Sequence, residues 1–235
     1  LSKNPYISKK FNQQEIFTKI YKNQYWKTKD SVSGSGSDFN YIKTYLKNLD
    51  IFFNDYKIKS FFDVPCGNFL FMNSFLENKN IDYLGGDIVK QLISRNINKY
   101  PKYKFKYFDI TKDTIKKSFD VLHVRDCLFH FSYEDIEKAL NNIFKVKSKY
   151  ILITNHKGLL MKNYNITTGK FRPLDFEKEP FFFPKPMEKI KDYKIGQFPR
   201  YVYVWEAKEL KKHFNKIKKN VVLISNGGGG IATFQ

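Results

Sequence analysis

The sequence predicts an α/β domain built on a mostly parallel, doubly wound sheet. From residue 60 onward, short apolar segments of strand length alternate with longer segments whose apolar residues recur at helical spacing. Parallel strands need crossover connections, and the helices that supply them cover both faces of the sheet. The length of 235 residues suits a single domain with a real buried core.

Two helices are expected before the sheet. Apolar residues recur at helical spacing over residues 11–25 and again over residues 39–53, and Ser37 or Asp38 is a suitable N-cap for the second helix. The serine- and glycine-rich stretch Ser31–Ser37 lies between them. This stretch is either a flexible linker or a lid.

Five buried parallel strands with intervening helices follow. The strands are expected at Ser60–Val64, Asp82–Gly86, Tyr103–Phe108, Phe119–Val124 and Tyr150–Thr154. Helices are expected at 69–78, 88–99 and 133–146, the last opened by a capping pattern of Ser132 and Asp135.

The alternation stops after the fifth strand. Residues 156–200 contain five prolines, and we interpret them as an ordered insertion over one end of the sheet. A strand at Tyr201–Trp205, a helix near 206–218 and a last strand at Val221–Ser225 complete the predicted domain.

Composition excludes several classes of protein. Hydrophobic residues make up 42% and aromatic residues 18% of the chain, which excludes a disordered protein. There is no apolar run of membrane-spanning length, and Leu1–Lys10 lacks the apolar centre of a signal peptide, so we expect a cytoplasmic protein without membrane insertion. Cys66 and Cys127 stand in separate motifs without metal-ligand spacing, so neither a disulfide framework nor a metal site is predicted.

The net charge of +19 suggests an anionic partner. The basic residues, however, are 38 lysines and only four arginines, together with abundant Asn, Ile, Phe and Tyr, as AT-rich codon usage would produce. Proteins that bind nucleic acids usually rely on arginine for bidentate contacts. We therefore favour a small anionic ligand over nucleic acid.

Three acidic residues at strand ends form the most informative pattern. The first strand runs into FFDVPCGNF, in which Asp63 precedes a tight turn at Gly67. Asp87 ends the second strand twenty residues after Gly67, where a carboxylate can accept hydrogen bonds from ribose hydroxyls, and Asp109 ends the third. Asp63 and Asp87 could instead merely cap helices, but jointly the three acids favour a nucleotide site. The glycine patterns of dinucleotide folds and phosphate loops are missing, which argues against NAD and ATP.

The turn resembles the first motif of class I S-adenosylmethionine-dependent methyltransferases, which has the form apolar-apolar-Asp-apolar-Gly-Cys-Gly-x-Gly. Pro65 and Phe69 replace two of its glycines. The chain is more similar to a small bacterial subgroup with capsule-pathway members, through Trp26, Ser31–Ser37, the DVPCG turn, Gly86-Asp87-Ile88 and the RDCLFH segment that contains Arg125 and His130. That likeness spans most of residues 26–184.

The resemblance implies a Rossmann-like methyltransferase fold and S-adenosyl-L-methionine as cofactor, with S-adenosyl-L-homocysteine as product. It divides a single domain, 1–235, into a helical lid (1–58), a cofactor-binding core (59–155), an acceptor-side insertion (156–200), final strands and helix (201–225) and a mobile tail (226–235). Cofactor contacts are expected from Trp26, Ser33, Ser35, Asp63, Pro65, Gly67, Asn68, Asp87, Ile88, Asp109, Ile110 and Arg125. Arg125 could pair with the methionine carboxylate or with an internal acid.

His130 is the candidate general base. Imidazole is largely neutral at pH 7 and can accept a proton from a hydroxyl, and Asp126 could orient the ring. The alternative is a structural histidine beneath the helix that begins at Tyr133. Cys127 is interpreted as packing beside the cofactor, since methyl transfer requires no covalent intermediate.

Acceptor contacts are expected from Arg172, whose guanidinium suits phosphate or carboxylate, and from His156 and Lys157 after the fifth strand. Asp175 stands where the subgroup usually has Asn. The predicted function is methyl transfer to an oxygen of a small anionic acceptor, phosphorylated or linked to a nucleotide or sugar, extending to capsule phosphoramidate biosynthesis. The alternatives are an RNA or DNA methyltransferase and a non-catalytic cofactor-binding protein. The sequence carries no prediction of oligomeric state.

Overall fold

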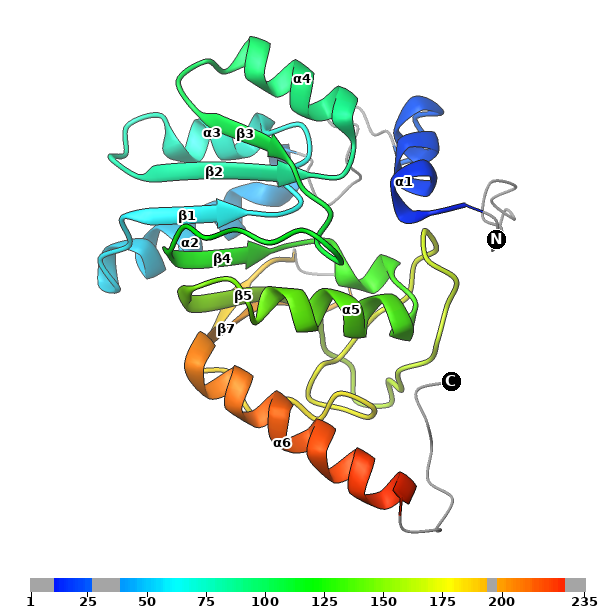
Figure 1. The fold of residues 1–235 in the computed structure, drawn as a ribbon. Coiled ribbons are helices and arrows are strands. Elements are labelled where there is room, and N and C mark those ends of the chain that lie inside the picture. The colour runs from blue at the N-terminus through cyan, green and yellow to red at the C-terminus, as the bar shows by residue number, and fades with distance from the viewer. Residues whose placement is uncertain (1–10, 27–38, 194–197, 227–235) are drawn as a thin grey trace.

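A seven-stranded sheet organises the chain (Figure 1). The computed structural model describes residues 11–26, 39–193 and 198–226. Its strands are β1 (Ser60–Asp63), β2 (Asp82–Asp87), β3 (Lys104–Tyr107), β4 (Phe119–Val124), β5 (Ser148–His156), β6 (Glu188–Lys191) and β7 (Arg200–Glu206), in the order β3-β2-β1-β4-β5-β7-β6. The first five are parallel, and β7 pairs antiparallel to both β5 and β6. The predicted α/β class and all five parallel strands are confirmed, with ends that differ by at most two residues.

Helices pack on both faces of this sheet. They are α1 (Gln13–Lys22), α2 (Phe39–Asp55), α3 (Leu70–Leu76), α4 (Lys90–Lys99), α5 (Tyr133–Ile143) and α6 (Ala207–Asn226), with a short 3-10 helix at Leu128–His130. One apolar cluster joins α5 and α6 to one face of the sheet, and a second joins α2 and α3 to the other. Neighbouring strand residues divide between the clusters: Phe62 and Leu122 join the first, Phe61 and Val121 the second. This alternation is what a central sheet buried on both faces requires.

Local sequence signals set several helix ends. Asn12 and Glu15 form a reciprocal capping box at the start of α1. Ser132 Oγ accepts a hydrogen bond from the Asp135 backbone N–H, so the predicted N-cap of α5 is confirmed. Ser37 and Asp38, the expected caps of α2, lie outside the described residues.

One expectation about the end of the domain is wrong. The strand expected at Val221–Ser225 is the last part of α6, which continues to Asn226. No Gly or Pro interrupts residues 207–226, so a helix started at Ala207 can continue through a β-branched run. The sheet instead gains β6, within the segment we interpreted as the insertion.

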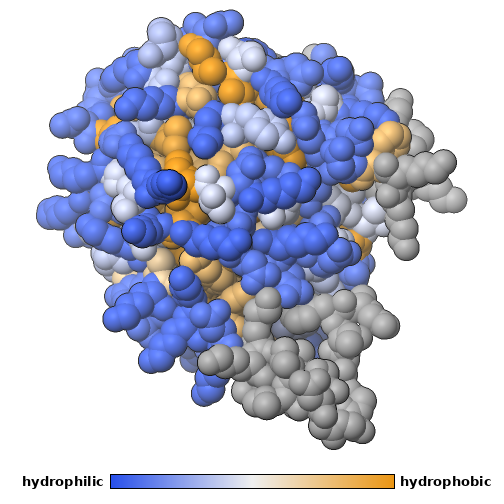
Figure 2. All heavy atoms as spheres, viewed as in Figure 1, coloured by the Kyte–Doolittle hydropathy of each residue, from blue (hydrophilic) through white to orange (hydrophobic). Residues whose placement is uncertain are grey.

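Different helices lie beyond the two ends of the parallel strands. Figure 1 shows α1 beyond their carboxyl ends, whereas α6 begins at the other end of the sheet, where these strands start. Hydrophilic residues cover most of the face shown in Figure 2, with a narrower band of hydrophobic residues between them. Among the described residues, no helix is both long and apolar enough to cross a membrane.

Candidate functional site

A cavity lies at the carboxyl ends of the parallel strands, where open α/β sheets bind ligands. Helix α1 covers it with Gln13, Phe17, Ile20 and Tyr21. The remaining lining residues are Trp26, Asp63, Val64, Pro65, Cys66, Gly67, Asn68, Phe71, Asp87, Ile88, Val89, Leu92, Phe108, Ile110, His123, Arg125, Asp126, Cys127, His130 and Phe131. The cavity thus collects most of the predicted site residues, together with an apolar wall that the sequence analysis did not identify.

The turn after β1 brings backbone to the cavity. Gly67 has φ 53°, a left-handed conformation that glycine adopts without strain, and its carbonyl accepts a hydrogen bond from Asn96 Nδ2 at 2.8 Å. Phe69 stands in place of the family's last glycine and also adopts a left-handed conformation, with φ 58°. Its fully buried ring packs against Tyr83, Tyr103 and Phe105, and this packing offsets the strain.

Asp87 is the buried carboxylate of the cavity. Its Oδ2 accepts from the Gly67 backbone N–H at 3.1 Å and its Oδ1 from the Val89 N–H at 2.8 Å. Only 4% of the residue is exposed, and burial raises the pKa of its carboxyl from 3.8 to about 6, partly opposed by these hydrogen bonds. At pH 7 the group is mostly ionised and is a strong hydrogen-bond acceptor.

Asp63 is held by a buried chain of polar contacts. Its Oδ1 lies 2.7 Å from His123 Nδ1, and its Oδ2 accepts from the Tyr83 hydroxyl at 3.0 Å. Tyr45 lies 2.7 Å from His123 Nε2. A carboxylate only accepts, so His123 Nδ1 donates to Asp63, and burial raises the pKa of the Tyr45 phenol well above its ordinary value, so its hydroxyl keeps its proton beside Nε2. The chain fixes the Asp63 carboxylate at the cavity wall.

Arg125 belongs to a cluster of four charged side chains. Its Nε and Nη2 each donate to Asp192 at 2.9 Å, and its Nη1 lies 3.1 Å from Asp126. Arg200 completes the cluster, 3.0 Å from both Asp126 and Asp192. The internal acids anticipated for Arg125 are therefore present, while Arg125 also lines the cavity. The neighbouring guanidinium groups hold the pKa of Asp126 below its ordinary value against the effect of burial, so Asp126 stays ionised.

His130 presents one nitrogen for proton chemistry. Its Nδ1 lies 2.9 Å from the Lys170 carbonyl oxygen, and a carbonyl only accepts, so Nδ1 carries the proton and Nε2 does not. Trp26 stacks on the ring at 4.3 Å between centroids. Burial lowers the pKa of His130 to about 4, so the imidazole is neutral at pH 7. Asp126, expected to orient this ring, instead bonds to the two arginines and Thr154.

Asp109 does not line the cavity, although its neighbours Phe108 and Ile110 do. Its Oδ1 accepts from the backbone N–H and the hydroxyl of Thr111, at 2.9 and 2.7 Å. Asp109 therefore stabilises its own turn, which is a common role for an acidic residue after a strand.

The acceptor-side residues lie away from the cavity lining. Arg172 is fully buried: Nη1 donates to the Phe129 carbonyl at 3.1 Å, and Nε and Nη2 have no hydrogen-bond partner in the described part of the chain. Arg172 does not line the cavity, so its expected contact with an acceptor stays a prediction. His156 is also buried, and its Nδ1 accepts from the Leu174 N–H at 3.2 Å.

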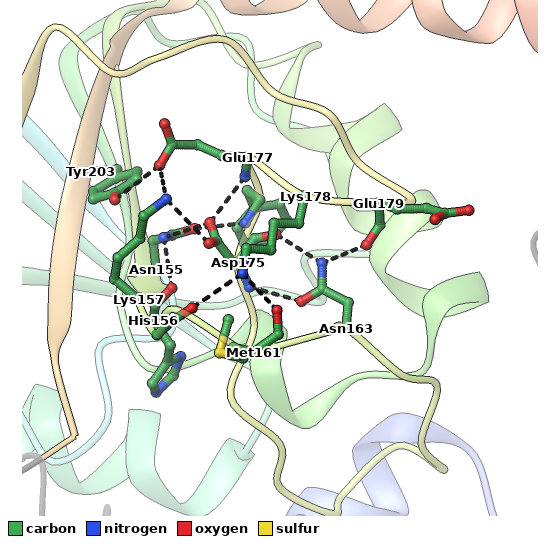
Figure 3. A network of polar contacts seen from close by, with 12 residues as sticks. Asn155, His156, Lys157, Met161, Asn163, Asp175, Glu177, Lys178, Glu179 and Tyr203 are labelled. Carbon is green, nitrogen blue, oxygen red and sulfur yellow. Dashed lines mark hydrogen bonds and ion pairs between the residues drawn. The ribbon is translucent and has the colours of Figure 1, made fainter.

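Lys157 takes part in a polar network that ties the insertion to β5 (Figure 3). Its ammonium lies 2.6 Å from Glu177 Oε2 and 3.3 Å from Asp175 Oδ2, so it is committed to internal carboxylates and not to an acceptor. Asp175 also accepts from Asn155 Nδ2 at 3.1 Å. The departure from Asn at position 175 therefore falls in a structural network. Ser33 and Ser35 lie outside the described residues.

Comparisons with known proteins support the fold. No protein-family model matches the chain, and no curated protein matches it in sequence. Solved structures of methyltransferases are similar to it, among them the following three. The 1,6-didemethyltoxoflavin-N1-methyltransferase of Burkholderia thailandensis has a TM-score of 0.58 and 12% identity, over 82% of this chain and 86% of that chain. A TehB-like SAM-dependent methyltransferase of Corynebacterium glutamicum has a TM-score of 0.51 and 16% identity, over 82% and 97% of the two chains. A methyltransferase of Clostridium acetobutylicum has a TM-score of 0.52 and 12% identity, over 72% and 93%.

The chain thus has the Rossmann-like fold of class I methyltransferases. At these identities the likeness concerns the fold alone.

Proposed function

We propose that this protein is an S-adenosyl-L-methionine-dependent methyltransferase. The observation that carries the proposal is the buried Asp87 carboxylate, which meets the Gly67 turn at one cavity beneath α1. A carboxylate at the end of the second strand suits two vicinal ribose hydroxyls, which donate to it. The Burkholderia neighbour was solved with S-adenosylhomocysteine, which agrees with the proposal.

The lining of the cavity fits the parts of this cofactor by chemistry. Ile88, Val89, Leu92 and Ile110 offer an apolar surface to the adenine. Asp63 and Arg125 carry opposite charges, which suit the amino and carboxylate groups of the methionine portion. Pro65, Gly67, Asn68 and Trp26 complete the proposed cofactor contacts. We leave Asp109 out, because its carboxylate bonds within its own turn.

We further propose that His130 is the general base. When bound, the cofactor supplies an electrophilic methyl carbon on a sulfonium. The acceptor oxygen forms the new C–O bond as the C–S bond breaks, its electron pair stays on sulfur, and the acceptor proton passes to His130 Nε2. Because Nε2 carries a lone pair and no proton, this arrangement favours a hydroxyl over an oxygen that is already ionised.

The acceptor is proposed to be a small anionic molecule, phosphorylated or linked to a nucleotide or sugar, and the capsule phosphoramidate pathway is the narrower proposal. The support is the net charge of +19 and the resemblance of the RDCLFH and insertion segments. Nothing in the cavity lining itself selects oxygen over nitrogen.

Calorimetric titration with S-adenosylhomocysteine tests the cofactor. We expect micromolar binding by the wild type and a loss of at least about tenfold in Asp87→Ala, since one strong acceptor disappears. His130→Ala should keep the cofactor affinity within about threefold while turnover of phosphorylated sugars or nucleotides falls by about 10²–10⁴. Absence of binding by the wild type would sink the proposal. Unchanged turnover in His130→Ala would remove the base assignment alone.

A further inference from the structure

A second cavity, of about 630 Å³, lies at the end of the sheet where the parallel strands start, opposite the candidate cofactor site. It is formed where β1, β4 and β5 begin, beside the first turn of α6, and its lining includes Ser60, Phe119, Ser148 and Ala207. Figure 1 shows β5 and α6 both starting at this end of the sheet, away from α1. Its volume falls within the range of cavities that bind small molecules.

Five lysines line this cavity: Lys145, Lys147, Lys149, Lys208 and Lys211, which we call the lysine cluster. The one acidic residue of the lining is Asp120.

Asp120 is already committed to other partners. It lies 2.6 Å from the Lys149 ammonium and accepts from the backbone N–H groups of Lys59 and Ser60 at 2.8 and 2.9 Å. These contacts keep the pKa of its carboxyl below the ordinary value. It therefore neutralises Lys149 and leaves the rest of the lysine cluster uncompensated.

The remaining lysines have no acidic partner in the described residues. No carboxylate there lies within 4 Å of Lys147, Lys208 or Lys211, and Lys145 bonds to the neutral Asn142 Oδ1 at 3.2 Å. Gathering unpaired like charges around one cavity costs free energy unless an anion joins them.

Two further features of the cavity suit an anion. Ser148 belongs to the lining and is half-buried, so its backbone and side chain contribute polar groups to the wall. The first turn of α6, which lines the cavity with Ala207 and Lys208, carries the positive end of a 20-residue helix. Lysines are unfavourable at such an end, and the acidic Glu209 of this turn does not line the cavity.

The floor of the cavity is apolar. Phe119, Phe144, Val146 and Ile151 contribute to the lining behind the charged rim. A ligand that fits therefore combines negative charge with an organic portion. Lysine binds phosphate as a point charge, and two linked phosphate groups carry about −2.5 to −3 charges at pH 7, which offsets most of the four excess positive charges of the lining.

We propose that the lysine cluster binds a small organic molecule that carries two linked phosphate groups, of the nucleoside diphosphate class. This site is separate from the candidate cofactor cavity and does not depend on the proposed methyl transfer.

The test compares two variants of equal net charge. Lys147→Gln/Lys208→Gln/Lys211→Gln removes three members of the lysine cluster, and Lys79→Gln/Lys117→Gln/Lys138→Gln removes three lysines that pair with acids elsewhere. Pyrophosphate and uridine diphosphate are titrated calorimetrically into each variant and the wild type at about 0.15 M salt, where long-range charge effects are screened. We expect the cluster variant to lose at least about tenfold in affinity for both probes, and the control variant less than about threefold.

Several outcomes would overturn the proposal. Equal losses in the two triple variants would mean that only the net charge matters, and absence of pyrophosphate binding by the wild type would remove the site. If an oligonucleotide without terminal phosphates binds through the same lysines and uridine diphosphate does not, the surface would be assigned to nucleic acid. Asp87→Asn serves as a further control, and loss of pyrophosphate binding in it would place the probe in the cofactor cavity. Thermal melting checks the fold of each variant, and Lys211→Gln alone, at an exposed helical position, replaces the triple variant if that fails to fold.

Discussion

The ionisation of Asp87 should control cofactor affinity between pH 5 and 7. Its carboxyl has a pKa of about 6, because burial penalises the charged form. If only the ionised form accepts from both ribose hydroxyls, about one molecule in eleven is competent at pH 5 and about nine in ten at pH 7. The apparent Kd for S-adenosylhomocysteine should therefore be about tenfold higher at pH 5 than at pH 7. His130 and His156, whose pKa values are about 4, stay largely neutral over this interval.

The assay is calorimetry at pH 5, 6, 7 and 8 on the wild type and on Asp87→Asn. The variant should bind more weakly and with the same affinity at each pH, because the titrating group is gone. A wild-type Kd that stays constant from pH 5 to pH 8 would refute the reasoning, as would a pH dependence that survives in Asp87→Asn.

Ionisation of Asp87 is expected to strengthen cofactor binding but to lower the stability of the fold. Its pKa in the folded protein is raised above 3.8, so between pH 4 and 6 the folded state binds more protons than the unfolded state, and stability falls as pH rises through this range. Each pKa unit corresponds to about 1.4 kcal/mol, so the ionised Asp87 costs about 3 kcal/mol at pH 7. Urea denaturation should accordingly show Asp87→Asn losing little stability at pH 7, since the relieved burial penalty offsets its weakened hydrogen bonds.

Three other predictions concern packing and the cavity wall. Phe69→Ala should lower the free energy of unfolding by about 3–5 kcal/mol in urea denaturation, because the fully buried ring holds four aromatic neighbours, and a loss below about 1 kcal/mol would contradict this account. Asp192→Ala should cost about 3–5 kcal/mol by the same measurement, since it leaves Arg125 buried without its two-bond partner, and near-wild-type stability would count against the cluster. Binding of S-adenosylhomocysteine should change the tryptophan fluorescence of the wild type but not of Trp26→Phe, because Trp26 lines the cavity while Trp205 does not; a fluorescence change that persists in Trp26→Phe would show that Trp26 is not the reporter.

Local patterns predicted the central parallel strands β1 and β4 because these strands are buried on both faces. An apolar run such as Phe119–Val124, buried throughout, has no solvent-facing position that would break it up. The strand β6 could not be recognised in this way: it reads EKIK, lies at the sheet edge, and buries only Ile190. The run Val221–Ser225 was wrongly predicted to be a strand because it is rich in β-branched residues. These residues favour strands only weakly when a helix already precedes them.

The candidate site was predictable where the backbone fixes the side chain. Gly67 and Asp87 lie at the ends of two parallel strands, and the sheet alone brings them together. Asp109 and Lys157 were correctly assigned to strand ends, but their side chains bond to Thr111 and Glu177, and residue type gives no information on such partners. The apolar spacing of residues 11–25 predicted a helix, whereas the residues that α1 contributes to the cavity were not predicted.

The positions at which the insertion leaves and rejoins the sheet determine which part of this protein can change during evolution without disturbing the rest. Residues 157–187 depart from the end of β5 and return at β6, and both strands pair with β7. The network of Asp175 and Lys157 anchors the departing end without touching Asp87 or Gly67. Sequence changes within this excursion can therefore accumulate while the strands that position Asp87 stay paired. A fold arranged in this way lets the excursion vary independently of the strand ends around Asp87.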